Sequence, residues 1–341
     1  LLSRISGITF YDFKESFYKP LELVVRSFID RKYGDYVYVS RHDRIAEIVF
    51  NNAFESPDEK SYQLVKIIRY LNSGYDTDRQ AIEYLIKGRL LADSFADKKL
   101  AVNIFKAAEE AIVPRHFLLH QQAVYELHHQ GGDINYALKL IEESESCAPR
   151  HVLKSIQHTK ANVYRRLAHL ETELAEKTAL RDKAIALLSQ AITKRPKDSM
   201  AHSLKAKLLL EELKDFVETV DIEDQSKLRV LDSLTKDIEL NFKSARELFP
   251  DDADMLNNEA EFSKFMQDMP RALSILEKAY KTNKTNLFIS LRLARHYFYQ
   301  QDQREEGLKI VRTTILAHPT SKEAHFELAK MLIDINELSY R

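Results

Sequence analysis

The sequence predicts an all-α protein built from repeated helix pairs, and three observations lead to this prediction. Only 7 glycines and 8 prolines occur in 341 residues, too few for the turns of an all-β or Rossmann architecture. Apolar residues recur at helical spacing along most of the chain. Four of the prolines also follow one spacing rule, which indicates an internal repeat.

The composition limits the class of protein further. The 51 basic and 52 acidic residues nearly cancel, so no overall field favours nucleic acid or an anionic membrane as a partner. Cys147 is the single cysteine, and no apolar run approaches the roughly 18 residues of a membrane span. We therefore expect a cytoplasmic chain that binds neither a membrane nor nucleic acid. Because the chain starts with LLSRISGITF, without a methionine or a signal sequence, we also expect it to be a piece of a longer protein.

Residues 1–55 have a different pattern from the rest of the chain. Apolar residues at helical spacing predict a helix over 20–31. The stretch YVYVS, residues 36–40, is rich in β-branched and aromatic residues and predicts a strand. A helical period returns from residue 45. A helix, a strand and a helix in succession form a small α+β element that resembles the end of a winged-helix domain.

A domain boundary is expected at Ser56-Pro57, where the pattern changes to helices alone. Residues 56–97 predict a connecting helix pair, with the sequences EKSYQLVKIIRYL and DRQAIEYLIKGRLLADSF. The repeat array is expected to follow over 98–341.

The repeat consists of a starting residue, a bulky residue 4 positions later, a small residue 7 positions later and a proline 12 positions later. Small residues let two helices approach closely, the bulky residue fills the groove between them, and the proline ends the helix. The windows are Ala137–Pro149, Ala184–Pro196, Ile238–Pro250 and Gly307–Pro319; the bulky residues are Ile141, Leu188, Phe242 and Val311; the small ones are Ser144, Ala191, Ala245 and Thr314.

A whole unit of 34 residues, 253–286, has small residues at places 8, 20 and 27. These residues are Ala260, Ala272 and Ala279. They resemble the tetratricopeptide repeat, a helix-turn-helix unit with small residues at the same places. GGDINYALKLIEESESCAP, residues 131–149, is the best single match, whereas Lys284 replaces the terminal proline of the unit from 253. The resemblance covers 98–341 and implies an all-α, tetratricopeptide-like helix-turn-helix solenoid, preceded by the small winged-helix-like α+β remnant.

The resemblance also implies a ligand-binding face, because places 2, 5, 9, 12 and 13 of each first helix face the concave side in that family. The implied partner-binding residues are Asp254, Asn257, Glu261, Lys264 and Phe265 in one unit, and Phe288, Leu291, Arg295, Phe298 and Tyr299 in the next. The second set is aromatic and basic, which is typical of interface anchors. The alternative is that a neighbouring helix or a C-terminal cap buries this set.

Patterns for catalysis or metal binding are weak. His116 and His120 have the spacing of a zinc pair, but Phe117 stands where a metalloprotease helix has glutamate, so ordinary helix-surface histidines are the favoured interpretation. We find no Gly-rich phosphate loop, no G-x-S-x-G elbow and no Cys-His signature. Acidic stretches such as EESES and FPDDAD are expected on the solvated face. We therefore expect no catalytic residue, metal or cofactor in this segment.

The stretch RHDRIAEIVF, residues 41–50, allows two interpretations. Ser40 and Asp43 fit a capping box at the start of a helix, in which case His42 needs no function. The stretch also resembles the His-Asp element that closes the switch module of signal-transduction ATPases with numerous domains (STAND ATPases), a class that includes plant immune receptors and bacterial relatives. That resemblance implies that His42 contacts the β-phosphate of bound ADP and that Asp43 supports it. A helix N-terminus attracts phosphate through its free N–H groups.

The sequence therefore allows two alternative functions for the whole chain. In the first, it is the ligand-sensing region of a bacterial STAND ATPase in antiviral, innate-immune-like defence. A protein ligand, in the favoured case a phage protein, binds the repeats, shifts the parent to a homo-oligomer and frees an upstream effector. ATP or ADP with Mg²⁺ belongs to the ATPase module of that parent, so this segment alone is not expected to hydrolyse ATP. In the second, the chain is a stand-alone tetratricopeptide scaffold or peptide-binding adaptor without an enzymatic link.

Overall fold

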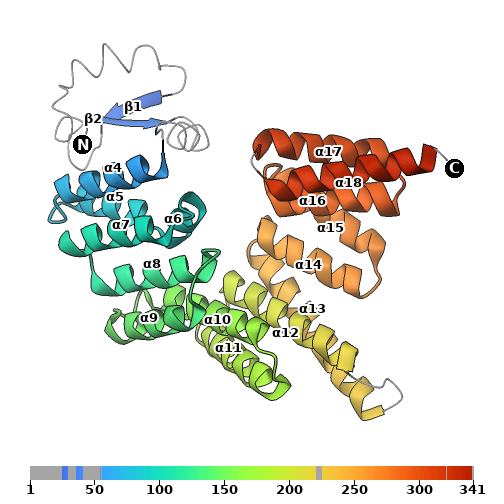
Figure 1. Cartoon of the computed structure of the whole chain (residues 1–341). Helices are drawn as coiled ribbons and strands as arrows, with labels where there is room; N and C mark the ends of the chain where they lie inside the picture. The colour runs from blue at the N-terminus through green and yellow to red at the C-terminus, as the bar shows by residue number, and fades with distance from the viewer. Residues whose placement is uncertain are drawn as a thin grey trace. The chain divides into compact units, whose positions relative to one another are not determined.

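The computed structural model describes residues 56–219, 225–319 and 321–339, together with Phe54 and the backbone of 25–29 and 36–40. It divides the chain into two compact units, Leu1–Lys177 (unit 1) and Thr178–Arg341 (unit 2). Figure 1 labels the helices and strands, and each unit is described by itself. Helices make up most of the described residues of both units, as the composition predicts.

Two strands in unit 1, β1 (Val25–Ile29) and β2 (Tyr36–Ser40), form an antiparallel pair with Val25 opposite Ser40. The strand predicted over 36–40 is confirmed, whereas the helix predicted over 20–31 is wrong for the residues of β1. The short run VRSFI fits both periods, and its β-branched and aromatic residues favour strand pairing. The helix expected from residue 45 lies outside the described residues.

The described part of unit 1 continues as a series of helices packed against one another. They are α4 (Pro57–Tyr70), α5 (Asp76–Leu85), α6 (Gly88–Ser94), α7 (Lys98–Glu110), α8 (Arg115–His128), α9 (Ile134–Cys147) and α10 (Leu153–Leu170). A further helix, α11 (Leu174–Lys194), begins near the end of unit 1. The expected change of pattern at Ser56-Pro57 coincides with the start of α4, where Ser56 Oγ accepts a hydrogen bond from the backbone N–H of Glu59 at 3.1 Å.

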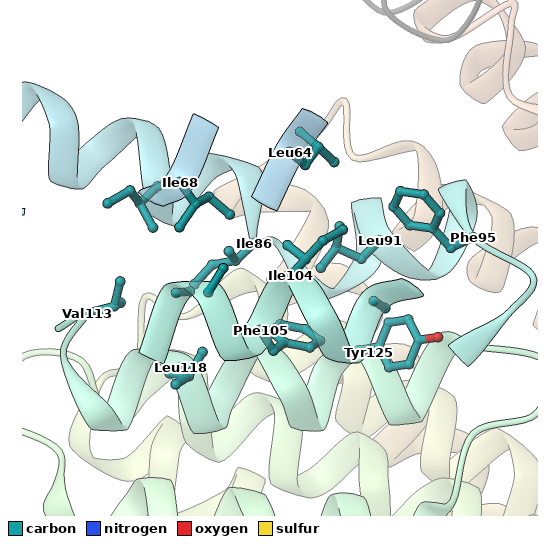
Figure 2. Close-up of a cluster of buried hydrophobic side chains, with 14 of the residues drawn as sticks. Leu64, Ile68, Ile86, Leu91, Phe95, Ile104, Phe105, Val113, Leu118 and Tyr125 are labelled. Carbon is teal, nitrogen blue, oxygen red and sulfur yellow. The ribbon is translucent and has the colours of Figure 1, made fainter. Parts of the chain in front are cut away.

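The core of unit 1 is an apolar cluster to which α4 to α8 all contribute (Figure 2). Leu64 and Ile68 come from α4, and Ile104 and Phe105 come from α7. Phe105 meets Tyr125 of α8 edge to face, with 5.8 Å between ring centroids. Each large apolar side chain that folding buries completely contributes about 1.5–3 kcal/mol, so this cluster holds the first helices together.

Unit 2 is a row of helix pairs in its described residues. After α11 its helices are α12 (Ser199–Thr219), α13 (Gln225–Leu248), α14 (Ala253–Phe265), α15 (Met269–Thr282), α16 (Leu287–Arg295), α17 (Arg304–Ala317) and α18 (Lys322–Ser339), and a π-helical segment, η3 (His296–Gln300), continues α16. Short polar side chains cap several of them. Asp252, Asp268 and Asn286 accept hydrogen bonds from backbone N–H groups at the starts of α14, α15 and α16.

The repeat pattern predicted from the sequence is confirmed in both units. The bulky and the small residue of all four windows are buried. Each window's proline follows the last residue of a helix by two positions, as Pro149 follows Cys147 of α9 and Pro250 follows Leu248 of α13. The packing of small residues between paired helices therefore sets the geometry of the array.

Glycine is required at one turn between paired helices. A Cβ atom at Gly132, between α8 and α9, would lie 1.9 Å from the carbonyl oxygen of Glu126, whereas one at the preceding Gly131 would meet only the His129 ring at 3.6 Å. The two backbones therefore approach too closely for any side chain at Gly132. Gly132 belongs to residues 131–149, the best single sequence match to the repeat.

Candidate binding groove

Unit 2 contains a groove of about 570 Å³ formed by the first helices of successive pairs, α12, α14, α16 with η3, and α18, and by α15. Its lining residues are Lys214, Ala260, Glu261, Lys264, Phe265, Ala272, Leu276, Arg292, Arg295, His296, Tyr299, Gln300 and Lys330. The first helices thus supply most of the surface that a ligand in the groove meets.

Half of the residues that the sequence indicated for partner binding line this groove. They are Glu261, Lys264 and Phe265 of α14, Arg295 of α16 and Tyr299 of η3. The helical spacing of tetratricopeptide-like units brings these residues together from two consecutive repeats, although 30 or more positions separate the two sets in sequence.

The other five residues predicted for partner binding do not line the groove. Leu291 and Phe298 are buried in an apolar cluster with residues of α17 and α18, so the alternative interpretation, burial by a neighbouring helix, applies to these two. Asp254, Asn257 and Phe288 do not line the groove; Asp254 and Phe288 are exposed and Asn257 is half-buried. Only five of the ten residues predicted for partner binding therefore remain as candidates for contact with a ligand in the groove.

The groove is strongly basic. Five cations line it, Lys214, Lys264, Arg292, Arg295 and Lys330, against one carboxylate, Glu261. Lys214 and Arg292 both pair with Glu261, and the Arg292 Nη2 to Oε2 distance is 2.8 Å. Burial opposes ionisation of Glu261, but the hydrogen bonds and charges of these two cations lower the pKa of its carboxyl group. The ionised carboxylate therefore cancels part of the positive charge of the lining.

Arg295 links α16 to the last helix. Its Nε donates to Oε2 of Glu327 on α18 at 2.7 Å, and the Glu327 side chain is almost completely buried. This hydrogen bond is the main reason that the pKa of Arg295 is raised. Arg295 therefore stabilises the fold as well as lining the groove.

Tyr299 forms part of the groove wall beside α18. Its hydroxyl donates to Oδ2 of Asp334 at 2.8 Å, and Nζ of Lys330 lies 5.3 Å from its ring centroid. Burial and this hydrogen bond raise the pKa of the phenol. Tyr299 is 44% exposed, so part of the residue remains accessible to a ligand.

His296, which the sequence did not single out, lines the same groove. It starts the π-helical segment, in which Gln301 N donates to His296 O at 3.2 Å. His296 is only 5% exposed, and its Nε2 has no hydrogen-bond partner among the described residues. Burial, and then the charge of Lys264, lower the pKa of this histidine. π-Helical turns often occur at functional sites, but no sequence signal marks this one.

The remaining sequence candidates lie outside the groove. His42 and Asp43 are outside the described residues. His120 Nε2 is 2.8 Å from the hydroxyl of Thr159, which fits a helix-packing histidine. In the part of the chain that the structure describes, no helix has the length and apolarity needed to cross a membrane.

Solved structures with a similar fold are tetratricopeptide proteins and related helical repeats. TTC0263, a thermophilic TPR protein of Thermus thermophilus, is 15% identical with a TM-score of 0.50, over 64% of this chain and 99% of that one. Human IFIT1, solved as a dimer with PPP-AAAA, is 16% identical with a TM-score of 0.55, over 87% of this chain and 70% of that one. A monomeric mutant of IFIT1 with Gppp-AAAA is 16% identical with a TM-score of 0.51, over 87% and 67%. No protein-family model and no curated protein sequence matches the chain. The chain therefore has the all-α, tetratricopeptide-like helical repeat fold that its sequence predicts.

Proposed function

We propose that this chain is a protein-binding repeat region whose ligand, a segment of another protein, lies in the groove of unit 2. The observation that carries the proposal is the lining itself. It combines five cations with the partly exposed Tyr299 and apolar side chains, on the helices that face the ligand in tetratricopeptide-like repeats. Arginine and tyrosine on a surface of this kind act as interface anchors.

A peptide-display selection against the purified chain tests this function. Selected peptides are measured by fluorescence anisotropy against the chain and against two groove variants, Lys264→Glu and Tyr299→Ala. Loss of one anchor is expected to raise Kd about fivefold to thirtyfold, or about 1–2 kcal/mol. Arg295 is a poorer choice, because a glutamate there would face the buried Glu327.

The matched control is Lys281→Glu, which makes the same charge change on the exposed surface of α15 away from the groove lining. Its Kd is expected to equal that of the unchanged chain. Circular dichroism and the urea midpoint establish that each variant folds. Equal affinity of the selected peptides for the groove variants and the unchanged chain would contradict binding in this groove.

We further propose that the repeat region is the sensor of a bacterial STAND ATPase in antiviral defence, with a phage protein as its ligand. Support comes from the sequence RHDRIAEIVF, which stands shortly before the helical repeats and resembles the His-Asp element of STAND ATPases. That resemblance implies that His42 contacts ADP and that Asp43 supports it. A ligand that prefers the active state shifts the parent protein away from its ADP-held state by that difference in affinity.

The alternative, a stand-alone scaffold or adaptor, uses the same groove but no nucleotide. The native sequence upstream of Leu1 distinguishes the two, because a phosphate-loop domain there supports the sensor and a start codon just before Leu1 rules it out. In the intact protein, His42→Ala is expected to weaken ADP binding. Unchanged ADP affinity and activity would leave only a capped helix at this position.

A further inference from the structure

We infer that the ligand of the groove is an acidic protein segment, and that His296 and Lys264 hold one of its carboxylates. The inference rests on the proposed function and names the chemistry of its ligand. It starts from one residue, His296, which is 95% buried, lines the groove and has an Nε2 atom without a hydrogen-bond partner among the described residues. Buried polar atoms are nearly always paired, so an unpaired one on a side chain that lines a groove points to a ligand atom.

Lys264 supplies the charge beside this ring. It lies on the neighbouring helix α14, is exposed, and forms no ion pair with the described residues. Its charge reaches His296, since it contributes to lowering the pKa of the ring. A ligand carboxylate between the two would accept a hydrogen bond from Nε2 and pair with the ammonium group.

The rest of the lining favours an acidic peptide over the phosphate chain of a nucleic acid. The carboxylates of Glu261 in the groove and of Asp334 at its edge interrupt the cations, and they would repel a continuous row of phosphates. Phe265 and Leu276 line the same groove and suit the aliphatic side chains of a peptide. The lining therefore fits a peptide whose carboxylates are separated by apolar residues.

Binding should also be coupled to protonation of His296. The charged groups that act on the ring are Lys264 from α14 and Glu277 from α15, and Glu277 already accepts a hydrogen bond from the Tyr297 hydroxyl at 2.6 Å. α17 packs against η3 through Gly307 and through apolar side chains such as Val311. Glu306 of α17 acts on the neighbouring Tyr297, but it is not among the charges that shift the pKa of His296. A bound carboxylate adds a negative charge that raises the pKa of the ring. Affinity should then increase as pH falls from about 8 to about 6, while glutamate ligands stay ionised.

The test measures anisotropy of a fluorescein-labelled peptide of alternating glutamate and leucine on the full chain. A glutamine-leucine peptide is the uncharged comparator, and oligouridylate is the phosphate comparator. The acidic peptide is expected to bind best, and about threefold or more tightly at pH 6 than at pH 8. His296→Gln should abolish this ratio. Lys264→Gln should weaken binding about fivefold at both pH values, whereas Lys281→Gln should not.

NMR of the histidine ring gives a readout that needs no variant. In the unchanged chain, saturating acidic peptide should raise the pKa of His296. Equal binding of the glutamine peptide, tighter binding of oligouridylate, or an unmoved His296 titration would each overturn the inference. If display-selected peptides bind in the groove but are not acidic, the proposed function stands and this inference fails; if nothing binds in the groove, both fail.

Discussion

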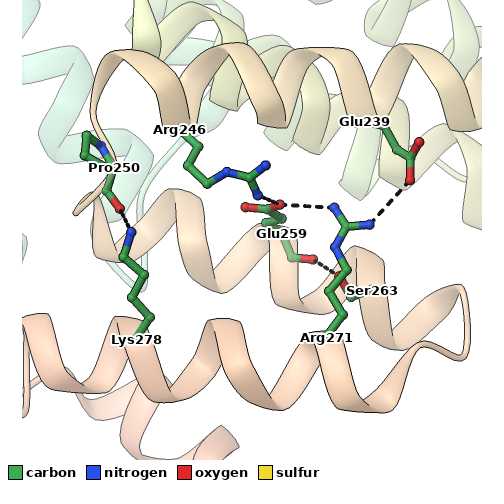
Figure 3. A network of polar contacts seen from close by, with 7 residues as sticks. All are labelled: Glu239, Arg246, Pro250, Glu259, Ser263, Arg271 and Lys278. Atoms are coloured by element: carbon green, nitrogen blue, oxygen red, sulfur yellow. Dashed lines mark hydrogen bonds and ion pairs between the residues drawn. The ribbon is translucent and has the colours of Figure 1, made fainter.

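In each unit a glutamate is buried on the first helix of a helix pair, Glu126 on α8 and Glu259 on α14. Glu126 is neutralised by one lysine and accepts a hydrogen bond from one backbone group: Lys98 Nζ lies 2.6 Å from Oε1, and Asp133 N donates to Oε2 at 2.8 Å. Glu259 is neutralised by two arginines instead, Arg246 from α13 and Arg271 from α15, both on Oε1 (Figure 3).

Glu126 and Glu259 therefore have different structural roles in the helical repeats. Glu126 fixes a turn, because one of its partners is the N-cap residue of the next helix. Glu259 joins three consecutive helices, and its Oε2 has no partner among the described residues. A buried carboxylate is costly unless its charge is compensated, so Glu259 depends wholly on its two arginines.

The largest expected effect comes from removing both cations of Glu259. Arg246→Met with Arg271→Met should lower the free energy of unfolding by about 3–5 kcal/mol, because a buried charge is left uncompensated. Lys98→Met should cost less, about 1–3 kcal/mol, since Glu126 keeps the hydrogen bond from Asp133. Urea unfolding followed by circular dichroism measures both.

Adding Glu259→Met to the double variant provides the control. Replacing a whole buried ionic group by apolar residues is often nearly neutral, so most of the stability should return. If the triple variant is no more stable than the double one, the loss came from the arginine side chains and not from the stranded carboxylate.

A second comparison concerns the turn that Glu126 fixes. Gly132→Ala should lower the free energy of unfolding by about 1–3 kcal/mol, because the new Cβ atom meets a backbone oxygen that cannot move freely. The neighbouring Gly131→Ala should change it by less than about 0.5 kcal/mol, since only a side-chain ring is near. Equal urea midpoints for the two variants would contradict a close backbone approach at Gly132.

The array could be predicted because its signals are local. The residues of each window occupy one helix face, and the proline directly after them ends the helix. Spacing alone therefore identified Ala137 and Ile141 as buried residues of one helix, and Pro149 as a residue just beyond its end. Glu261, Lys264 and Tyr299 were likewise predicted to share one face from their places within a repeat, and they line the groove.

The rest depends on neighbours distant in sequence. Whether Phe298 contacts a ligand or the core is decided by packing with α17 and α18, and the aromatic pattern of HYFYQ is the same in both cases. Glu259 is one carboxylate among many, and only its position between two arginines from other helices marks it as buried. The π-helical turn that places His296 in the groove leaves no periodic signal at all.

The smallest expected effect is a change in acid stability at His120 of unit 1. Its Nε2 has a partner, Thr159, unlike Nε2 of His296 in unit 2. Burial, and then the charge of His116, lower the pKa of His120 to about 4. An unfolded histidine has a pKa of about 6.5, so protons bind the unfolded chain more readily. The stability linked to His120 is therefore complete above pH 6.5 and is lost as pH falls toward 4, by about 1–2 kcal/mol at pH 5.

The variant His120→Gln tests this loss, because glutamine keeps a partner for the Thr159 hydroxyl but does not titrate. Its urea midpoint should therefore fall less between pH 7 and pH 5 than that of the unchanged chain. If the two midpoints fall in parallel, His120 is not the group that loses stability in acid.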